Sequence, residues 1–449
     1  MRDKDIFIAL NRFGLGMSEG DIALAKDAPR EWVKAQISPK YLKPKSLTDM
    51  PGAAQLLGQY YEMRKDTKAG DPRRRAATKM RKDSMIAALE TRALHKVTTP
   101  APVVERFTQF WSNHFTVSRT RGQIGQAIPA YETEAIRPYI FSKFEDLLLA
   151  AVTHPCMLLY LDNVSSVGPN SKRGRRRDKD LNENLAREVL ELHTMGAGGG
   201  YTQNDIIEFA KVLSGWTVQK VRGERGGTHF AVSSHEPGKK TILGKTYKGD
   251  GARELIAVLR DLAVHPSTAT FIAKKLAKHF ISDTPAQADI DVLAKAYQRS
   301  GGDLAKVSQA LVDLDSVWTD PLPKLKTPED LVFAVLRADP SKIRPKRKLR
   351  KARVAQALKT MGQDMFNAPS PAGWPEETDR WLSPESLVHR IEWVRDYASK
   401  MDPTVNPDDL FDVTIAPAAD RESVKMIKGA PSREDAIAMI FASAAFQRR

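Results

Sequence analysis

The stretch LNENLAREVLELHTMG at residues 181–196 decides the fold class. At 100° per residue, its polar side chains fall on one stripe about 100° wide, and apolar side chains cover most of the remaining girth. Gly196 and the glycines at 198–200 end the helix. The pattern predicts a buried helix whose polar stripe faces a cavity or an internal network. The stripe consists of Asn184, Arg187, Glu188 and Glu191.

The residue types in this stripe are those found in catalytic and metal-binding sites. Glu188 and Glu191 are two carboxylates three residues apart, with Arg187 beside them. Such a set suits general acid/base catalysis or a hard divalent metal ion. The alternative is an ordinary amphipathic helix with these charges on its solvent face. His193 falls on the opposite side, in the last turn, where it is either a capping or core residue or a ligand-binding one.

Helical periodicity extends outward from this stretch over most of the chain. Residues 100–116, 202–213 and 266–281 have clear helical patterns, and further ones cover 287–299, 303–314, 328–338 and 432–446. Residues 216–247 differ, because Val, Thr and Gly enrichment with a Pro-Gly turn predicts two or three short strands. We therefore expect a mainly α protein, one continuous domain over 1–449, with a small β-hairpin or short-sheet insertion. Two loops are expected, a basic one at 163–180 and a Pro/Gly-rich one at 362–385.

Three histidines are further candidates. His114 and His279 lie on the apolar faces of their predicted helices, where a histidine is commonly a core residue. His235 precedes a Pro-Gly turn in a polar loop and is freer to bind a ligand. The chain has no His-Glu-x-x-His motif and no cysteine pair, so a divalent metal would need ligands from distant segments. The metal candidates are Glu188, Glu191, His114 and His235.

The composition narrows the class of protein. The chain has 449 residues, of which 41% are hydrophobic and 28% charged, as in a globular protein. Its single cysteine, Cys156, excludes an intramolecular disulfide framework. The N-terminus lacks the long apolar core of a secretory signal, and no window approaches ~18 apolar residues. We expect a cytoplasmic protein with no membrane span.

The net charge of +15 comes from three runs, 73–82, 172–177 and 344–353. They hold 18 of the 70 bases, and the rest of the chain carries 52 bases against 55 acids. Such runs can bind a polyanion or simply be solvated. Because aromatic residues are scarce beside them, we do not expect a nucleic-acid partner. The run at 172–177 is the one expected beside the polar pocket, as a cover or an anion guide.

Many longer stretches resemble one bacterial family, the domain of unknown function 1800, over essentially the whole chain. The matching stretches include ALNRFGLG at 9–16, FWSNHFTVS at 110–118, AIRPYI at 135–140, THPCMLLYLDN at 153–163, SVGPNS at 166–171, LNENLAREVLELHTMG at 181–196, GGYTQND at 199–205, LSGWT at 213–217, HEPGKKTILG at 235–244, HPSTATFIAKKLAKHF at 265–280, SPAGWPE at 370–376 and AFQRR at 445–449. The chain departs from the family at Cys156, which argues against a nucleophilic thiol, and at Ala444-Ala445.

The resemblance implies a partner and a pocket but no reaction. Members of the family are often encoded beside proteins similar to the alkaline-phosphatase superfamily, which implies such a protein as a partner, and many members look exported. The family-like stretches also contain the polar residues singled out above, which predicts that they share one pocket. The residues expected to line this pocket are Asn113, His114, Asp162, Asn163, Asn184, Arg187, Glu188, Glu191 and His235.

The resulting hypothesis is a hydrolase-like enzyme acting on a polar or anionic substrate. Glu188, Glu191, His114, His235 and Arg187 would be the catalytic groups. The expected substrate-binding residues are Asn113, Asp162, Asn163, Asn184 and His193. The alternative is a non-catalytic binding or assembly protein that uses the basic runs for a polyanion, or that assembles with the phosphatase-like partner.

Overall fold

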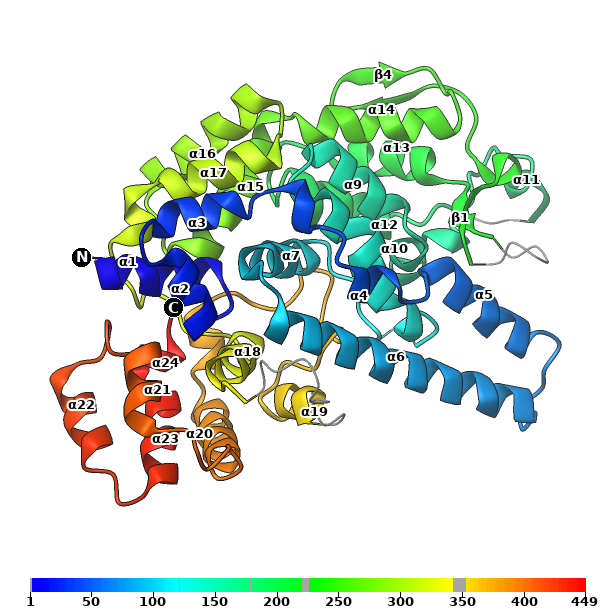
Figure 1. Cartoon of the computed structure of the whole chain (residues 1–449). Helices are drawn as coiled ribbons and strands as arrows, with labels where there is room; N and C mark the ends of the chain where they lie inside the picture. The colour runs from blue at the N-terminus through cyan, green and yellow to red at the C-terminus, as the bar shows by residue number, and fades with distance from the viewer. Residues whose placement is uncertain (1, 121, 178–179, 220–225, 342–352) are drawn as a thin grey trace.

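The computed structural model describes residues 2–120, 122–177, 180–219, 226–341 and 353–449. It is mainly helical, as predicted, with two small antiparallel sheets of two strands each in the described part. Figure 1 shows the helices packed around α7 and α15, with the C-terminal helices grouped at one end of the molecule. The prediction that residues 1–449 form one continuous domain stays a prediction.

Three of the predicted helices show why the sequence pattern was informative. They are α7 (Pro102–His114), α13 (Gln203–Leu213) and α15 (Pro266–Phe280). Helix α13 begins with a capping box, in which the Thr202 and Asp205 side chains each accept the other's backbone N–H. Helix α15 has proline in its first turn, and the His265 ring accepts the Ser267 N–H. These local signals fix the helix starts without tertiary contacts.

The remaining helices include those predicted at 287–299, 303–314, 328–338 and 432–446, together with others that the sequence pattern did not single out. The α-helices are α1 (Arg2–Ile8), α2 (Glu19–Ala25), α3 (Pro29–Ala35), α4 (Lys45–Thr48), α5 (Ala53–Arg64), α6 (Pro72–Thr98), α8 (Ile128–Tyr131), α9 (Phe144–Thr153), α10 (Pro155–Tyr160), α11 (Gly174–Arg177), α12 (Asn184–Glu188), α14 (Ala252–Ala263), α16 (Gln287–Ser300), α17 (Leu304–Asp313), α18 (Pro328–Ala338), α19 (Arg353–Thr360), α20 (Pro384–Ala398), α21 (Pro407–Thr414), α22 (Arg421–Lys428), α23 (Arg433–Ala442) and α24 (Ala444–Gln447). Short π-helical segments are η1 (Ala9–Phe13), η4 (Glu132–Ile136) and η7 (Val189–Thr194).

The stretch that predicted the fold is only partly an α-helix. Helix α12 ends at Glu188, and the chain continues as the π-helix η7, with the Met195 N–H donating to the Leu190 carbonyl at 2.9 Å. A π-helix has a wider turn than an α-helix. The assumed spacing of 100° per residue therefore does not hold for Glu191 and His193. The sequence analysis did not anticipate this change, because it assumed one spacing of 100° per residue over the whole stretch.

The predicted β insertion is present as two hairpin-like pairs. Strand β1 (Trp216–Val218) pairs with β2 (Thr228–Phe230), and β3 (Lys240–Ile242) pairs with β4 (Lys245–Tyr247). The β3–β4 loop has two residues, Leu243 and Gly244, both with positive φ, as a tight hairpin turn requires. Leucine is unusual there, and its N–H donates to the Asp205 carboxylate at 2.7 Å, which ties the hairpin to α13.

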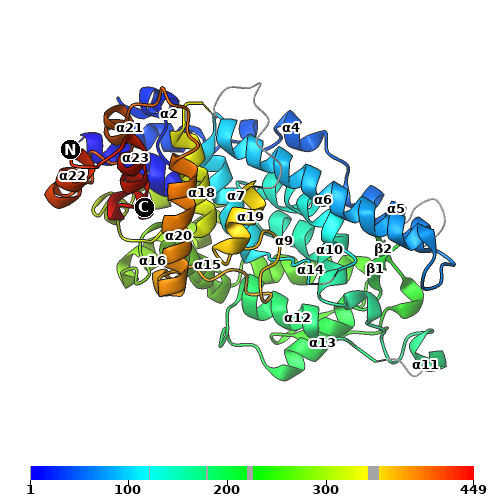
Figure 2. The ribbon, with the colours of Figure 1, turned by 90° about the horizontal axis from the view of Figure 1, so that it is seen from below.

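Two clusters of buried apolar side chains hold the fold together. The larger one surrounds α7, α9, α10 and α15, and the second surrounds α18, α20 and α23 near the C-terminus. Figure 2 shows α18 lying between α7 and the C-terminal helices. Almost every side chain of α7 and every one from Pro328 to Ala338 except Glu329 is buried. Charged residues on these helices must therefore find partners inside the protein.

No single described helix has the length and apolar character needed to cross a membrane. Helices α14 and α15 meet such a criterion only as a pair, bent by 63° at the break between them.

Candidate functional site

The residues of the predicted carboxylate stripe lie near the surface. Arg187, Glu188 and Glu191 are half-buried and Asn184 is exposed. The Arg187 guanidinium is paired with Glu183, with Nη2 2.9 Å from Oε2. Partial burial and the neighbouring Glu191 carboxylate raise the pKa of Glu188. The stripe is thus a partly solvated cluster on α12 and η7.

Two of the predicted residues, His114 and His193, meet inside the larger core. The ring nitrogen Nε2 of His114 donates to the His193 carbonyl at 3.0 Å, and the two ring centroids are 6.1 Å apart. Aromatic rings, including Phe115, surround both imidazoles. Burial lowers the pKa of His193 to about 3 and that of His114 well below its usual value, and the Lys275 ammonium adds to both effects. Both rings are therefore neutral at physiological pH.

Three further predicted residues, His235, Asn163 and Asp162, lie in a separate network around β1. His235 Nδ1 donates to the Ser214 carbonyl at 2.8 Å, and Nε2 is 3.5 Å from the Glu254 carboxylate, which also binds Lys240 at 2.8 Å. Asn163 donates to the carbonyls that precede and begin β1, those of Leu213 and Trp216. Asp162 takes a left-handed backbone conformation with φ 56° just before it. These contacts hold the 162–171 segment against the β insertion.

No group of three or more His, Cys, Asp and Glu side chains that could hold a metal ion occurs in the described part of the chain. The metal candidates Glu188, Glu191, His114 and His235 stay a prediction, and so do their catalytic roles.

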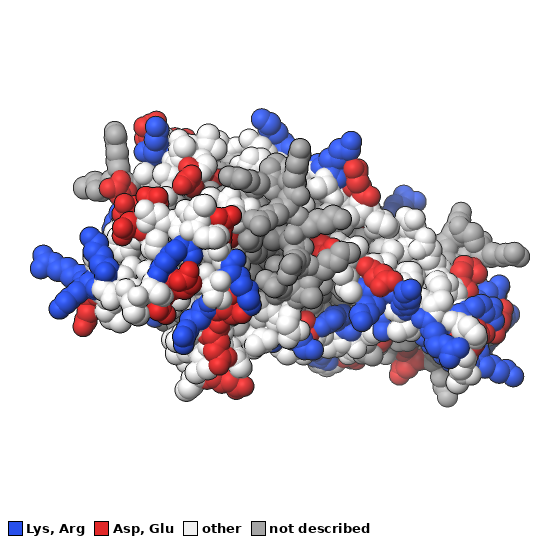
Figure 3. Space-filling model, turned by 60° about the horizontal axis from the view of Figure 1, so that its bottom comes forward, with Lys and Arg blue, Asp and Glu red and all other residues white. Residues whose placement is uncertain are grey.

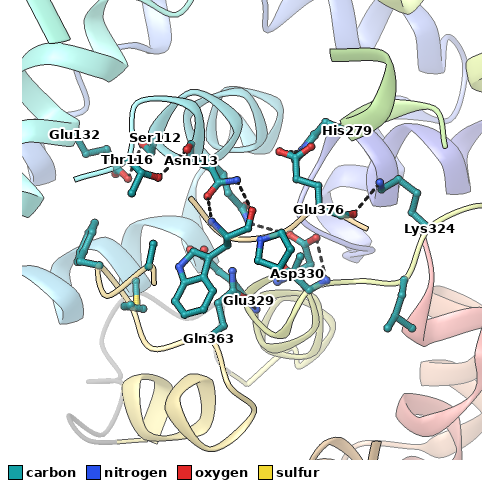
Figure 4. Close-up of a pocket in the computed structure, with 18 of the residues that line it drawn as sticks. Ser112, Asn113, Thr116, Glu132, His279, Lys324, Glu329, Asp330, Gln363 and Glu376 are labelled. Carbon is teal, nitrogen blue, oxygen red and sulfur yellow. Dashed lines mark hydrogen bonds and ion pairs between the residues drawn. The ribbon is translucent and has the colours of Figure 1, made fainter. Parts of the chain in front are cut away.

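A cavity of about 100 Å³ lies elsewhere, between α7, α18 and the loop that carries SPAGWPE. Helix α7 contributes Gln109, Ser112 and Asn113, α18 contributes Glu329 and Asp330, and the loop contributes Trp374, Pro375 and Glu376. In Figure 4 the Glu376 side chain points toward His279 of α15, and Lys324 lies on the other side of the loop. Of the predicted site residues, Asn113 alone lines this cavity.

The SPAGWPE loop is fixed to α7 by the Asn113 side chain. Its Nδ2 donates to the Trp374 carbonyl at 3.0 Å, and its Oδ1 accepts the Trp374 N–H at 2.7 Å. Gly373 has φ +87°, and a Cβ at this position would lie 2.5 Å from Asn113 Oδ1 and 2.8 Å from Thr116 Oγ1. Only glycine allows this close approach. The loop thus carries Trp374 and Glu376 into the cavity wall.

We predict that Gly373→Ala detaches the loop from α7 and lowers stability by about 2 kcal/mol or more, because positive φ and a clash act together. Gly362→Ala is the matched control, since Gly362 has φ +88° but open space around its Cβ position. Urea unfolding of both variants separates the clash from the backbone strain. Equal losses in the two variants would contradict the proposed close contact with Asn113.

Three of the four cavity carboxylates are neutralised by cations. Glu132 accepts Arg92 at 2.9 Å, and Glu329 accepts Arg92 at 2.9 Å and Lys96 at 2.7 Å. Burial alone would raise their pKa values, but these cations lower the pKa of Glu132 and bring that of Glu329 to about 2. Asp330 pairs with Arg106 and Arg449, which keep its pKa below the usual range despite burial.

Glu376 is the exception among these carboxylates. Its Oε1 lies 3.3 Å from Nδ1 of His279, and no Lys or Arg of the described residues contacts the carboxylate within ion-pair distance. Burial opposes ionisation, but His279, Lys275 and Lys324 together lower the pKa of Glu376. Burial lowers the pKa of His279 to about 4. At neutral pH the pair therefore consists of an ionised carboxylate and a neutral imidazole.

The backbone around Glu376 is held firmly by Lys324. Its ammonium donates to the Glu376 carbonyl at 3.0 Å, to the Lys278 carbonyl at 2.8 Å and to the Asp283 carboxylate at 2.6 Å. All three ammonium donors are used, so Lys324 acts as a fixed brace. The Glu376 side chain, in contrast, keeps acceptor capacity for a ligand.

Sequence reasoning missed most of this cavity. Glu376 lay in a predicted loop, His279 was weighed as a core residue, and Asp330 lay in a predicted helix. Asn113 and Trp374 are 261 positions apart in the chain, so no local pattern could join them. The available signals were the isolated SPAGWPE stretch and the Thr-Pro-Glu-Asp start of α18, a capping box with a buried acid.

These features define a mainly helical protein with a buried, densely ionised cavity near the C-terminal group of helices. The chain belongs to the family described as protein of unknown function DUF1800, whose model matches residues 8–448. No curated protein and no solved structure matches the chain.

Proposed function

We propose that the protein is a hydrolase-type enzyme and that the cavity around Glu376 is its active site. The observation that supports this is the contrast between Glu376 and its neighbours. The other cavity carboxylates are each paired with a guanidinium or ammonium, whereas Glu376 contacts an imidazole and retains free acceptor capacity. Ionised carboxylates beside neutral imidazoles are a common proton-transfer arrangement.

In this proposal Glu376 and His279 accept the proton of an attacking water or hydroxyl group. The ionised Glu376 lies 3.3 Å from the neutral His279 without a hydrogen bond between them, and one of the two groups takes the proton as the nucleophile adds to the substrate. A cavity of about 100 Å³ has room for several waters or for a small polar group. It therefore receives the reacting polar end of a substrate, next to the half-exposed indole of Trp374.

Glu376→Gln tests the proposal. We expect it to lower kcat/KM by at least ~100-fold, since removing a general base typically costs ~10²–10⁴ in rate. The assay uses chromogenic esters, phosphates, glycosides and anilides, and circular dichroism confirms folding. Glu377→Gln is the matched control, because Glu377 is the adjacent residue but pairs with Lys278 at 2.6 Å on the surface side. Full activity of Glu376→Gln on a substrate that the wild type hydrolyses would exclude the proposed role.

The alternative, binding of a polyanion through the basic runs, has one supporting observation. Figure 3 shows Lys and Arg side chains gathered over α6, where Arg75, Lys79 and Lys82 are exposed. The run at 172–177 lies around the short helix α11, and most of the run at 344–353 lies outside the described residues. Polyanion binding and assembly with a phosphatase-like partner stay predictions. Polyanion binding would show affinity that falls ~10³–10⁵-fold from 50 to 200 mM salt if 6–10 phosphates are contacted.

A further inference from the structure

Buried positive charge is in excess behind the cavity. Four cationic side chains, Arg106, Lys326, Arg390 and Arg449, surround Asp330 and are each at most 3% exposed. Asp330 is the carboxylate that attracts Lys326, Arg390 and Arg449 electrostatically. Arg449 is also attracted by Glu376 and by Asp283, which is already paired with Lys324. Counting side chains only, and leaving out the paired Asp283, three guanidinium groups and the Lys326 amine face two carboxylates.

Two of these cations are incompletely satisfied. The Arg390 guanidinium donates from Nη1 to Gln447 Oε1 at 3.1 Å, while its Nε and Nη2 have no hydrogen-bond partner among the described residues. Arg449 Nε is 3.2 Å from Asp330 but not in hydrogen-bonding geometry. In Arg106, in contrast, each guanidinium nitrogen donates, to Asp330 or to the carbonyls of Gly14 and Asn11.

The lowered pKa values of these cations show that burial disfavours their charged forms. Burial lowers the pKa of Arg390 and of Arg449 to about 10 and that of Lys326 to about 7. A buried guanidinium without a matching anion is destabilising by several kcal/mol unless something neutralises it. Arg449 also lines the cavity, so the excess charge is next to the space that a ligand would enter.

We infer that the cavity binds an oxyanion of its ligand, a carboxylate, phosphate or sulfate group, against Arg449, with Arg106 and Arg390 adding positive charge from behind. The inference rests on the proposed function, because it names the class of substrate that the proposed active site would bind. Guanidinium groups bind planar and tetrahedral oxyanions through paired N–H donors. Glu376 and His279, on the α15 side, would then act on the bond next to the anionic group.

Anion binding can be measured without any hydrolysis. The full-length protein is titrated with sodium phosphate, sulfate or acetate at constant ionic strength, with chloride as the reference, by thermal shift and isothermal titration calorimetry. We expect a saturable rise in Tm with at least one of the three oxyanions. A response to acetate alone indicates a carboxylate ligand, and a response to phosphate or sulfate a tetrahedral one. A Tm no higher in any oxyanion than in chloride would overturn the inference.

Single substitutions test whether the oxyanion binds at Arg449. Arg449→Gln should raise the Kd of the oxyanion at least tenfold, whereas Arg448→Gln should leave it unchanged, because the Arg448 side chain donates to the Leu322 carbonyl instead. Arg390→Met should also weaken binding and, without added anion, melt no lower than the wild type, because it removes an unsatisfied buried charge. Unchanged affinity in both Arg449→Gln and Arg390→Met would contradict the site.

The outcomes also separate this inference from the proposed function. Oxyanion binding that depends on Arg449, together with no hydrolysis of any substrate, would support the anion site and contradict the enzyme. Hydrolysis that depends on Glu376 but shows no inhibition by any oxyanion would support the enzyme and contradict the anion site.

Discussion

Asp330→Ala is expected to lower the free energy of unfolding by about 3–5 kcal/mol, the cost of removing one partner from a buried ion pair. Asp330 is 3% exposed and pairs with both Arg106 and Arg449. It also accepts from Gln109 at 3.1 Å and closes the capping box of α18 with Thr327. Without it, the Arg106 and Arg449 guanidinium groups would be buried without this counter-ion, and α18 would keep only the Thr327 half of its capping box.

Urea unfolding followed by circular dichroism measures this effect. Asp313→Ala is the control, because Asp313 forms an ion pair with Lys34 at 2.6 Å but is 57% exposed, and exposed pairs contribute little. An Asp330→Ala protein within about 1 kcal/mol of the wild type would show that the buried ion cluster does not hold the two groups of helices together.

The second large effect is loss of stability in mild acid. Burial lowers the pKa of His279 to about 4 and that of His193 to about 3, from 6.5, and it lowers the pKa of His114 well below its usual value. Below pH 6.5 the unfolded chain therefore binds more protons than the folded one, and stability falls as the pH decreases. His279 alone accounts for up to about 3 kcal/mol, and His193 adds to it.

The carboxylates act in the same direction at lower pH. The pKa of Glu329 is lowered from 4.5 to about 2, so the stability it contributes is complete above pH 4.5 and is lost as the pH falls toward 2. Stability should therefore fall continuously from pH 6.5 downward, first through the histidines and then through the carboxylates.

Unfolding free energies at pH 7.5, 6.5, 5.5 and 4.5 test this dependence. His193→Gln should flatten the profile between pH 6.5 and 4.5, while His229→Gln, at an exposed position of β2, should leave its slope unchanged. Constant stability from pH 7.5 to 4.5 would contradict burial of neutral imidazoles.

The helical fold was predictable because its signals are local. Thr202 with Asp205, and Pro266 after His265, specify helix starts within four residues. The β3–β4 turn was harder to predict, because Leu243 takes a positive φ and its N–H donates to the Asp205 carboxylate of α13. The change from α12 to the π-helix η7 was not predicted, because a single spacing of 100° per residue was assumed over residues 181–196.

The cavity was much harder to predict, because its chemistry depends on partners far apart in the sequence. In the sequence, Asp330 has the pattern of an ordinary acidic residue in the first turn of α18. Only the structure shows that it is buried and paired with Arg106 and Arg449. Glu376 differs from Glu377 only in its surroundings, His279 in one case and Lys278 in the other. Asn113 was singled out as a polar residue with no obvious packing role, but its partner Trp374 lies 261 positions away.

The central claim is that the functional cavity is the one around Glu376, and not the carboxylate stripe on α12 and η7. The most direct test measures kcat/KM of Glu376→Gln and Glu191→Gln side by side, on one substrate hydrolysed by the wild type. We predict a loss of at least ~100-fold for Glu376→Gln and a change of less than about twofold for Glu191→Gln. The reverse result, with activity lost in Glu191→Gln and kept in Glu376→Gln, would contradict the claim.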